Sequence, residues 1–227
     1  MAISAIVTDI EGTTTSLSFV KDILFPYAYD RMEAFLLRYH ERADVAAQIR
    51  EVEKIAGQEM NPGKTIALLK QWIEEDKKIA PLKTLQGMMW EEGYKNGDFK
   101  GHLYEDAAEV LKRWHHQNIA LYVYSSGSVQ AQKLLFAHTE WGDMTQLFKG
   151  YFDTAVGGKK EPVSYQHILA SIDKPAAEVL FLSDVTEELD AAEQAGMCTL
   201  QVVRDEPVAG STHPYVSDFY AIKPEHY

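Results

Sequence analysis

Several features are scarce in this 227-residue chain, and each scarcity excludes a class of protein. The single cysteine, Cys198, permits no disulfide within the chain, which agrees with a reducing compartment. No apolar run reaches the roughly 18 residues that a membrane-spanning helix needs. The N-terminal segment MAISAIVTDIEG has no basic stretch before its apolar residues, so we expect no secretory signal. The expected location is therefore the cytoplasm.

Basic residues are also scarce, because 22 lysines and arginines stand against 34 aspartates and glutamates, a net charge of −12. Such a chain repels polyanions, so we expect neither nucleic acid nor an anionic membrane as a partner. The charge is uneven: residues 18–100 contain 14 acidic and 13 basic residues, whereas the remainder contains 20 and 9. An anionic substrate would need a local cation in order to bind, because the protein around it carries an excess of negative charge.

The pattern of apolar residues predicts an α/β fold interrupted by a helical insertion. Residues 3–8 form an apolar, β-branched run that is typical of a buried strand. Between residues 18 and 97 the apolar positions recur at helical spacing, and no strand is indicated. After Gly101, predicted helices and strands alternate, which indicates a parallel sheet covered by helices on both faces. These elements are helices at 105–117, 128–138, 162–172 and 187–195, strands at 119–126, 151–156, 178–184 and 198–203, and an irregular tail after Asp205.

We therefore predict two domains. Residues 1–17 and 101–227 would form a Rossmann-like parallel sheet with its helices, and residues 18–100 would form an inserted all-helical cap. Ligands of open α/β sheets bind beyond the carboxyl ends of the strands, so the residues that follow the predicted strands are the candidates for a site. Those residues are acids, hydroxyls and lysines: Asp9, Glu11, Ser125, Ser126, Lys159, Lys160 and Asp184.

This combination of residue types suits phosphate chemistry. Carboxylates that converge on one place repel one another unless a hard cation joins them, and magnesium is the usual choice. Magnesium and a lysine would neutralise a phosphoryl group, hydroxyls and backbone N–H groups beside a glycine would hold its oxygens, and one carboxylate would attack phosphorus.

Taken singly, each of these residues has an ordinary structural interpretation. A strand-end aspartate caps turns, Ser-Ser-Gly caps helices, and most lysines are solvated. The occurrence of all the types after successive strands favours a site. Glu187, Glu188 and Asp190 are interpreted as an exposed helix turn, although Glu188 could face a metal.

The order of these motifs resembles the haloacid dehalogenase superfamily of phosphohydrolases, whose first motif is a strand followed by Asp-x-Asp-Gly-Thr. Here the segment VTDIEGTT has Glu11 in place of the second aspartate. With that departure, and with YVYSSGSVQAQKLLF, GYFDTAVGGKKEPVSY and FLSDVTEELDAAEQAGM, residues 3–204 closely resemble the enolase-phosphatases of methionine salvage.

The resemblance implies a role for each candidate residue and a two-step reaction. The substrate 2,3-diketo-5-methylthiopentyl 1-phosphate would be enolised and then hydrolysed to the acireductone 1,2-dihydroxy-3-keto-5-methylthiopentene and phosphate. The cap would close over the apolar thioether end. The implied magnesium ligands are Asp9, Glu11 and Asp184, the implied catalytic residues are Asp9 as nucleophile and Glu11 in acid–base work, and the implied phosphate ligands are Ser125, Ser126 and Lys159.

Three alternatives remain open at the level of the sequence. A phosphatase of the same fold could act on another small phosphate ester, since spacing alone does not exclude it. A signalling receiver module also has acids, a hydroxyl and a lysine at strand ends, but its phosphorylated aspartate follows a middle strand and no eighty-residue insertion follows its first strand. The chain could also be a binding protein on an inactive phosphatase scaffold. No loss of a candidate catalytic residue indicates this, because Asp9, Lys159 and Asp184 are all present. We expect a monomer.

Overall fold

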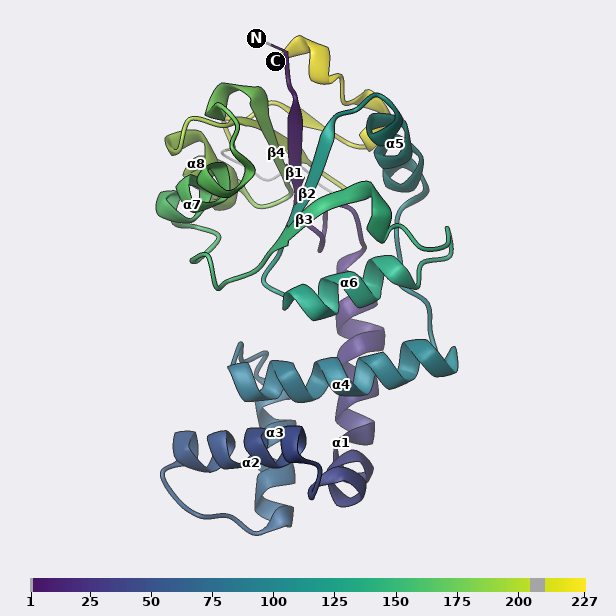
Figure 1. Ribbon diagram of the computed structural model, residues 1–227, viewed down its shortest axis with the longest axis vertical. Coiled ribbons are helices and arrows are strands. Elements are labelled where there is room, and N and C mark those ends of the chain that lie inside the picture. Colours follow the sequence, from purple (N-terminus) through teal and green to yellow (C-terminus); the bar gives the residue numbers. More distant parts are fainter. Residues whose placement is uncertain (1, 205–210) are drawn as a thin grey trace. The chain divides into compact units, whose positions relative to one another are not determined.

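The computed structural model describes residues 2–204 and 211–227 (Figure 1). The chain divides into two compact units: a sheet unit, Met1–Leu17 with Gly101–Tyr227, and a helical unit, Ser18–Lys100. None of the helices in the described ranges is both long and apolar enough to cross a membrane.

In its described residues, the sheet unit is built on six parallel strands in the order β3-β2-β1-β4-β5-β6. The central strand β1 is fully buried, as its unbroken apolar and β-branched sequence requires. This arrangement confirms the predicted α/β fold class. The strands are β1 (Ala5–Thr8), β2 (Ala120–Tyr124), β3 (Phe148–Phe152), β4 (Val179–Ser183), β5 (Cys198–Val202) and β6 (Tyr215–Val216).

The register of the sheet sets the level at which the strands end. Thr8 of β1 pairs with Val123 of β2 on one side and with Leu182 of β4 on the other. The residues that follow these strands therefore emerge side by side at one edge of the sheet.

Four helices pack around this sheet: α5 (Glu105–His116), α6 (Val129–Ala137), α7 (Pro162–Ile172) and α8 (Thr186–Gln194). Figure 1 shows α7 and α8 together on one side of the sheet and α5 on the other. Tyr165 and Ile168 of α7 and Leu189 of α8 are fully buried in one hydrophobic core with Phe181 of β4. This core fixes both helices, and with them the loops that precede them.

Two predicted elements differ from the structure. The strand expected at 151–156 is β3 at 148–152, because Asp153 starts a turn: its Oδ1 accepts the Ala155 N–H and its Oδ2 accepts the Val129 N–H. The tail expected to be irregular contains β6, which pairs with the edge of β5, and short 3-10 helices at Phe219–Ala221 and Pro224–His226. Part of that tail, residues 205–210, lies outside the described residues.

The helical unit contains no strand in its described residues, as predicted. Its interior is tied together by the Trp90 indole, which donates a 2.8 Å hydrogen bond to the Leu24 carbonyl, and by Phe99, which packs edge-on against Tyr27 and Tyr94. Its elements are a π-helix at Phe19–Leu24, α1 (Phe25–Tyr39), α2 (Ala43–Ala56), α3 (Pro62–Glu74) and α4 (Ala80–Asn96).

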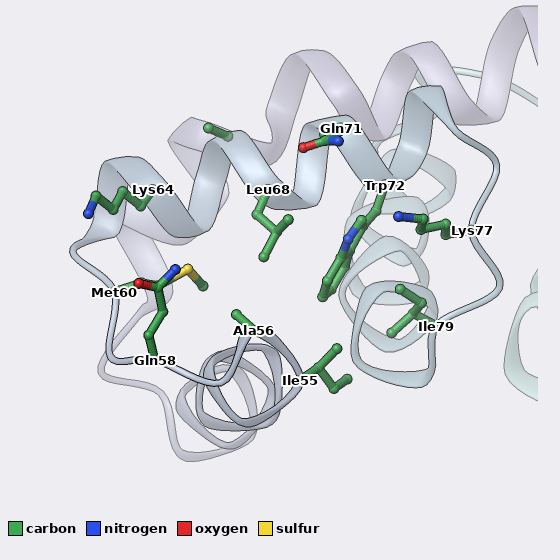
Figure 2. Close-up of a pocket in the computed structure, with 11 residues that line it drawn as sticks. Ile55, Ala56, Gln58, Met60, Lys64, Leu68, Gln71, Trp72, Lys77 and Ile79 are labelled. Atoms are coloured by element: carbon green, nitrogen blue, oxygen red, sulfur yellow. The ribbon is translucent and has the colours of Figure 1, made fainter.

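The helical unit also has a pocket of its own, with a volume of about 630 Å³ (Figure 2). Leu68 and Trp72 enter it from α3, and Ile55 lies across from them on α2. Its lining comes entirely from residues 55–79, so none of the candidate phosphate-site residues borders it.

Candidate active site

Asp9 follows the central strand directly and is only 4% exposed. Its N–H donates to the Leu182 carbonyl at 2.9 Å, which continues the pairing of β1 with β4 by one residue. The chain then turns tightly, because the Ile10 carbonyl accepts the N–H groups of residues 13–15. Gly12, with a φ of +77°, occupies a conformation that side chains disfavour, and this lets the turn form. These hydrogen bonds fix Asp9 at the start of the turn.

Lys159 lies on the loop between β3 and α7, and three buried hydroxyls fix that loop. Tyr124, Ser164 and Tyr165 donate to the successive carbonyls of residues 157–159, at 2.9, 2.7 and 2.6 Å. Each of these three carbonyls therefore accepts a hydrogen bond from a side chain of the core in place of one from water. The backbone that carries Lys159 is therefore held by side chains of α7 and β2 and not by backbone hydrogen bonds between strands.

The ammonium of Lys159 makes two short ion pairs. Its Nζ lies 2.6 Å from Asp9 Oδ1 and 2.6 Å from Glu188 Oε2, and its side chain is 10% exposed. Burial alone would lower the pKa of Lys159, but the negative charges of Asp9 and Glu188 outweigh it and raise that pKa above its ordinary value. Lys160 points elsewhere, with 63% of its side chain exposed, and pairs with Glu187. Only the first lysine of the pair belongs to the strand-end cluster.

Asp184 follows β4 and is held by Thr13 of the Asp9 loop. Its N–H donates to Thr13 Oγ1 at 3.0 Å, and the same hydroxyl lies 3.4 Å from Asp184 Oδ1. Burial, and then the negative charge of Asp9, raise the pKa of Asp184 to about 6. The two carboxylates are thus close enough to repel each other.

Glu188 corrects the interpretation of residues 187–190 as an exposed helix turn. It is 7% exposed, accepts a 2.9 Å hydrogen bond from Ser183 Oγ and pairs with Lys159. Burial and the charge of Asp9 both raise the pKa of Glu188. The exposed interpretation fails for Glu188 because it lies on the buried face of α8, with Ala191 and Ala192 three and four residues further along. That helical spacing was the available signal for it.

Ser125 and Ser126 follow β2, beside the Asp9 loop. Ser125 is 3% exposed; its N–H donates to the Phe152 carbonyl at 3.1 Å, and its Oγ accepts the Gly127 N–H at 3.2 Å. Ser126 is partly exposed. The cap of α6 is Ser128, whose side chain accepts the Ala131 N–H. The two predicted serines are therefore not the helix cap, and they lie at the start of a helix, where anions are favoured.

Glu11 lies on the turn after Asp9 and is partly buried. Within residues 2–204 and 211–227, no group of three or more His, Cys, Asp or Glu side chains forms a ready-made metal site. The three-carboxylate ligand set therefore stays a prediction.

A buried aspartate pairs with a lysine at the carboxyl end of the central strand of this parallel sheet, which is where the ligands of such sheets bind. The sequence comparison gives the class of protein: residues 3–196 match the haloacid dehalogenase-like hydrolase family, so the chain is a hydrolase of that family.

Individual relatives narrow this class. The chain is 54% identical to enolase-phosphatase E1 of Methylococcus capsulatus, over 98% of this chain and 99% of that protein, and 51% identical to enolase-phosphatase E1 of Pseudomonas syringae, over 99% of each. The crystal structure of the UTR4 protein of Saccharomyces cerevisiae superposes with a TM-score of 0.83 at 34% identity, covering 97% of this chain and 100% of that chain. The chain therefore belongs to the enolase-phosphatase E1 family, and the resemblance predicted from its motifs is confirmed. It is a phosphatase that acts on a small phosphorylated substrate.

Membership of this family brings a requirement for a divalent metal ion, and the site fits one. Asp9 and Asp184 present hard oxygen donors, and burial together with the charge of Asp9 raises the pKa of Asp184, a cost that a bound cation would offset. One or two carboxylates, completed by water and phosphate, are the ligands that Mg²⁺ commonly takes in proteins. The carboxylate of Asp184 packs against Gly12, where a Cβ would overlap it, so the absence of a side chain on residue 12 lets Asp184 take this position.

Proposed function

We propose that this enzyme converts 2,3-diketo-5-methylthiopentyl 1-phosphate into the acireductone 1,2-dihydroxy-3-keto-5-methylthiopentene and phosphate, as a step of methionine salvage. The metal is Mg²⁺. The observation that carries the proposal is the pairing of Asp9 with Lys159 at 2.6 Å, in a chain that is 54% identical to an enolase-phosphatase E1 over nearly its whole length.

In the hydrolytic step, a carboxylate oxygen of Asp9 attacks phosphorus while the bond from phosphorus to the ester oxygen breaks. Lys159 stands beside Asp9, so its ammonium meets the phosphoryl oxygens as the attacking carboxylate gives up its negative charge. Ser125 and Ser126 bind the same oxygens through hydroxyl and backbone N–H groups. Glu11 protonates the leaving oxygen and then activates the water that hydrolyses the aspartyl-phosphate.

Magnesium, when bound, polarises the substrate carbonyl for enolisation and offsets the charge that develops during hydrolysis. Asp9 and Asp184 would hold it, with Glu11 as the third predicted ligand. Lys159 already neutralises one oxygen of Asp9, which lets that carboxylate act as nucleophile and ligand at once.

The helical unit, residues 18–100, acts in this proposal as a cap that closes over the thioether end of the substrate and excludes water. Substitutions there should change the preference among phosphate esters more than the capacity to hydrolyse them. Equal losses of activity towards all esters would contradict a role in specificity.

The experiment that tests the function uses Asp9→Asn, which keeps an oxygen for the metal but removes the nucleophile. With the diketone substrate, absorbance of the conjugated enol and release of phosphate are followed in one reaction. We expect absorbance to rise without phosphate. Release at the wild-type rate would refute Asp9 as the nucleophile. If both signals vanish, a magnesium titration of the variant decides whether metal loss stopped both steps.

The matched control is Asp173→Asn, an exposed aspartate in a left-handed conformation that asparagine also accepts, and it should behave as wild type. A panel of other small phosphate esters, with and without magnesium, tests the alternative substrate. Faster turnover of any of them than of the diketone would overturn the proposed reaction.

We also propose that the enzyme acts as a monomer in the cytoplasm, since the proposed cap and the sheet-end site lie within one chain. Sedimentation velocity across a hundredfold range of concentration should give one species of 25.7 kDa. A stable dimer would contradict this.

A further inference from the structure

The side chain of Gln132, on α6, joins two loops at the edge of the sheet. It is 2% exposed, and its Nε2 donates one hydrogen bond to the Gly127 carbonyl and another to the Phe152 carbonyl, each 2.8 Å long. Gly127 belongs to the turn after β2, and Phe152 is the last residue of β3. Both N–H groups of one amide therefore donate hydrogen bonds that join these two segments.

The same two segments carry the hydrogen bonds of Ser125. The Phe152 carbonyl also accepts the Ser125 N–H, and the Ser125 hydroxyl accepts the Gly127 N–H. Gln132 thus closes a ring around the turn that would hold phosphate. Without the amide, the turn would keep one backbone hydrogen bond to β3, and the Gly127 carbonyl would lose the partner that sets its direction.

The glutamine uses only part of its hydrogen-bonding capacity at this position. Its Oε1 is buried and has no hydrogen-bond partner among the described residues. Turning the amide over would place that oxygen against two carbonyl oxygens, so the orientation is fixed. A buried polar atom without a partner is unfavourable, because it loses its hydrogen bond to water. The arrangement therefore accepts a local cost in exchange for the two donated hydrogen bonds.

We propose that Gln132 is a positioning residue that holds the turn of residues 125–127 in the shape that binds the substrate phosphate. This inference rests on the proposed role of Ser125 and Ser126 as phosphate ligands. It predicts that loss of the amide weakens phosphate binding and leaves the metal side of the site intact.

A second buried glutamine provides the contrast. Gln201, on β5, is 1% exposed, and its Nε2 donates to the Asp184 carbonyl at 2.8 Å and to Thr186 Oγ1 at 3.3 Å. It uses the same chemistry on the loop after β4, which carries a predicted metal ligand and no predicted phosphate ligand. Loss of its amide should therefore affect metal binding more than phosphate binding.

The experiment compares Gln132→Met, Gln201→Met and the control Gln146→Met in the full-length protein. Methionine is close to glutamine in size and length but has no N–H donor. Gln146 is an exposed glutamine that donates to a nearby carbonyl, that of Asp143, away from the strand ends. The following are measured for each: the inhibition constant of inorganic phosphate, KM and kcat separately, and the affinity for Mn²⁺ from the electron paramagnetic resonance of the free ion.

We expect Gln132→Met to raise the phosphate inhibition constant and KM at least tenfold, with Mn²⁺ affinity within twofold of wild type. Gln201→Met should give the reverse, and Gln146→Met should change neither. A Gln132→Met protein that binds phosphate as wild type does would overturn the proposal. So would equal losses of phosphate and metal binding in both buried variants, because that pattern reports general loosening.

Two further measurements keep the test decisive. If Gln132→Met does not fold, as judged by circular dichroism, Gln132→Asn takes its place, because it keeps the amide but cannot span both carbonyls. Ser125→Ala separates this inference from the proposed function: if it binds phosphate as wild type does, the assignment of the turn fails, whatever Gln132 does. If Ser125→Ala weakens phosphate binding and neither Gln132 variant does, only the positioning role fails.

Discussion

The backbone of Gly12 lies directly against the carboxylate of Asp184. A Cβ built on residue 12 would overlap the Asp184 side chain, and the φ of +77° is itself unfavourable for any residue that has a Cβ. The turn that carries Asp9 and the loop that carries Asp184 therefore pack closely against each other at this contact.

Gly12→Ala should displace Asp184 and lower both metal affinity and kcat by at least tenfold. The control is Gly142→Ala, because Gly142 has a similar φ of +85° but nothing within 4 Å of a Cβ. Both variants should lose about 1–2 kcal/mol of unfolding free energy because alanine disfavours a positive φ, and thermal unfolding measures this loss. Only Gly12→Ala should lose metal affinity in a magnesium titration, and equal activities of the two variants would contradict the contact.

Lys159 and Lys160 are neighbours with opposite surroundings, so their alanine variants should differ. Lys159→Ala removes the ammonium that contacts Asp9 and should lower kcat/KM by about 10²–10³, the loss typical of one preorganised donor. Lys160→Ala removes an exposed ion pair with Glu187 and should stay within twofold of wild type. Steady-state kinetics check this. The opposite order would show that the loop is oriented differently in the working enzyme.

The raised pKa of Asp184, about 6 against an ordinary 3.8, predicts a pH dependence of stability. Between about pH 4 and pH 6 the folded protein keeps a proton that the unfolded chain has released, so the free energy of unfolding of the metal-free protein falls as pH rises. The fall attributable to Asp184 is at most about 3 kcal/mol, complete above pH 6 and absent below pH 4.

Urea unfolding in the presence of a chelator tests this. Asp184→Asn lacks the titration, so it should gain stability relative to wild type between pH 4.5 and pH 7. Magnesium should restore wild-type stability at pH 7, because the cation replaces the proton, and the same chelator should abolish turnover. Parallel pH curves for the two proteins, or full activity without metal, would count against Asp184 as a ligand.

Arg204 holds the turn that follows Asp9 through the Thr13 carbonyl. Its Nε and Nη2 donate to the Thr13 carbonyl at 3.0 and 2.8 Å, and its Nη1 pairs with the largely buried Asp106 at 2.7 Å. Arg204→Met should cost about 3–5 kcal/mol of unfolding free energy, because it leaves the Asp106 carboxylate without its cation. Lys160→Met, which breaks an exposed pair, should cost less than about 1 kcal/mol in the same denaturant titration. Equal costs would show that the Arg204 pair is solvated in the folded protein.

The predicted strand boundaries were least reliable where a turn begins inside an apolar segment. Phe152 ends β3, and Asp153 then bonds to the N–H groups of residues on two different segments, one of them 24 residues away. A local pattern does not contain that second partner. For the same reason β6 was missed: two residues form a strand only because the edge of β5 offers them free backbone groups.

The sequence by itself determined that a parallel sheet would bring Asp9, Ser125 and Asp184 to one edge, because strand periodicity is local and parallel strands share the direction in which they end. It also determined the family, since the motifs occur in a fixed order along the chain. The resemblance selected Lys159 over Lys160, but the tertiary structure alone decided that Lys159 pairs with both Asp9 and Glu188, that Glu188 is buried, and that the amide of Gln132 ties the loop after β2 to the end of β3. These contacts join residues that packing brings together, up to 150 positions apart in the case of Asp9 and Lys159, and no local spacing specifies them.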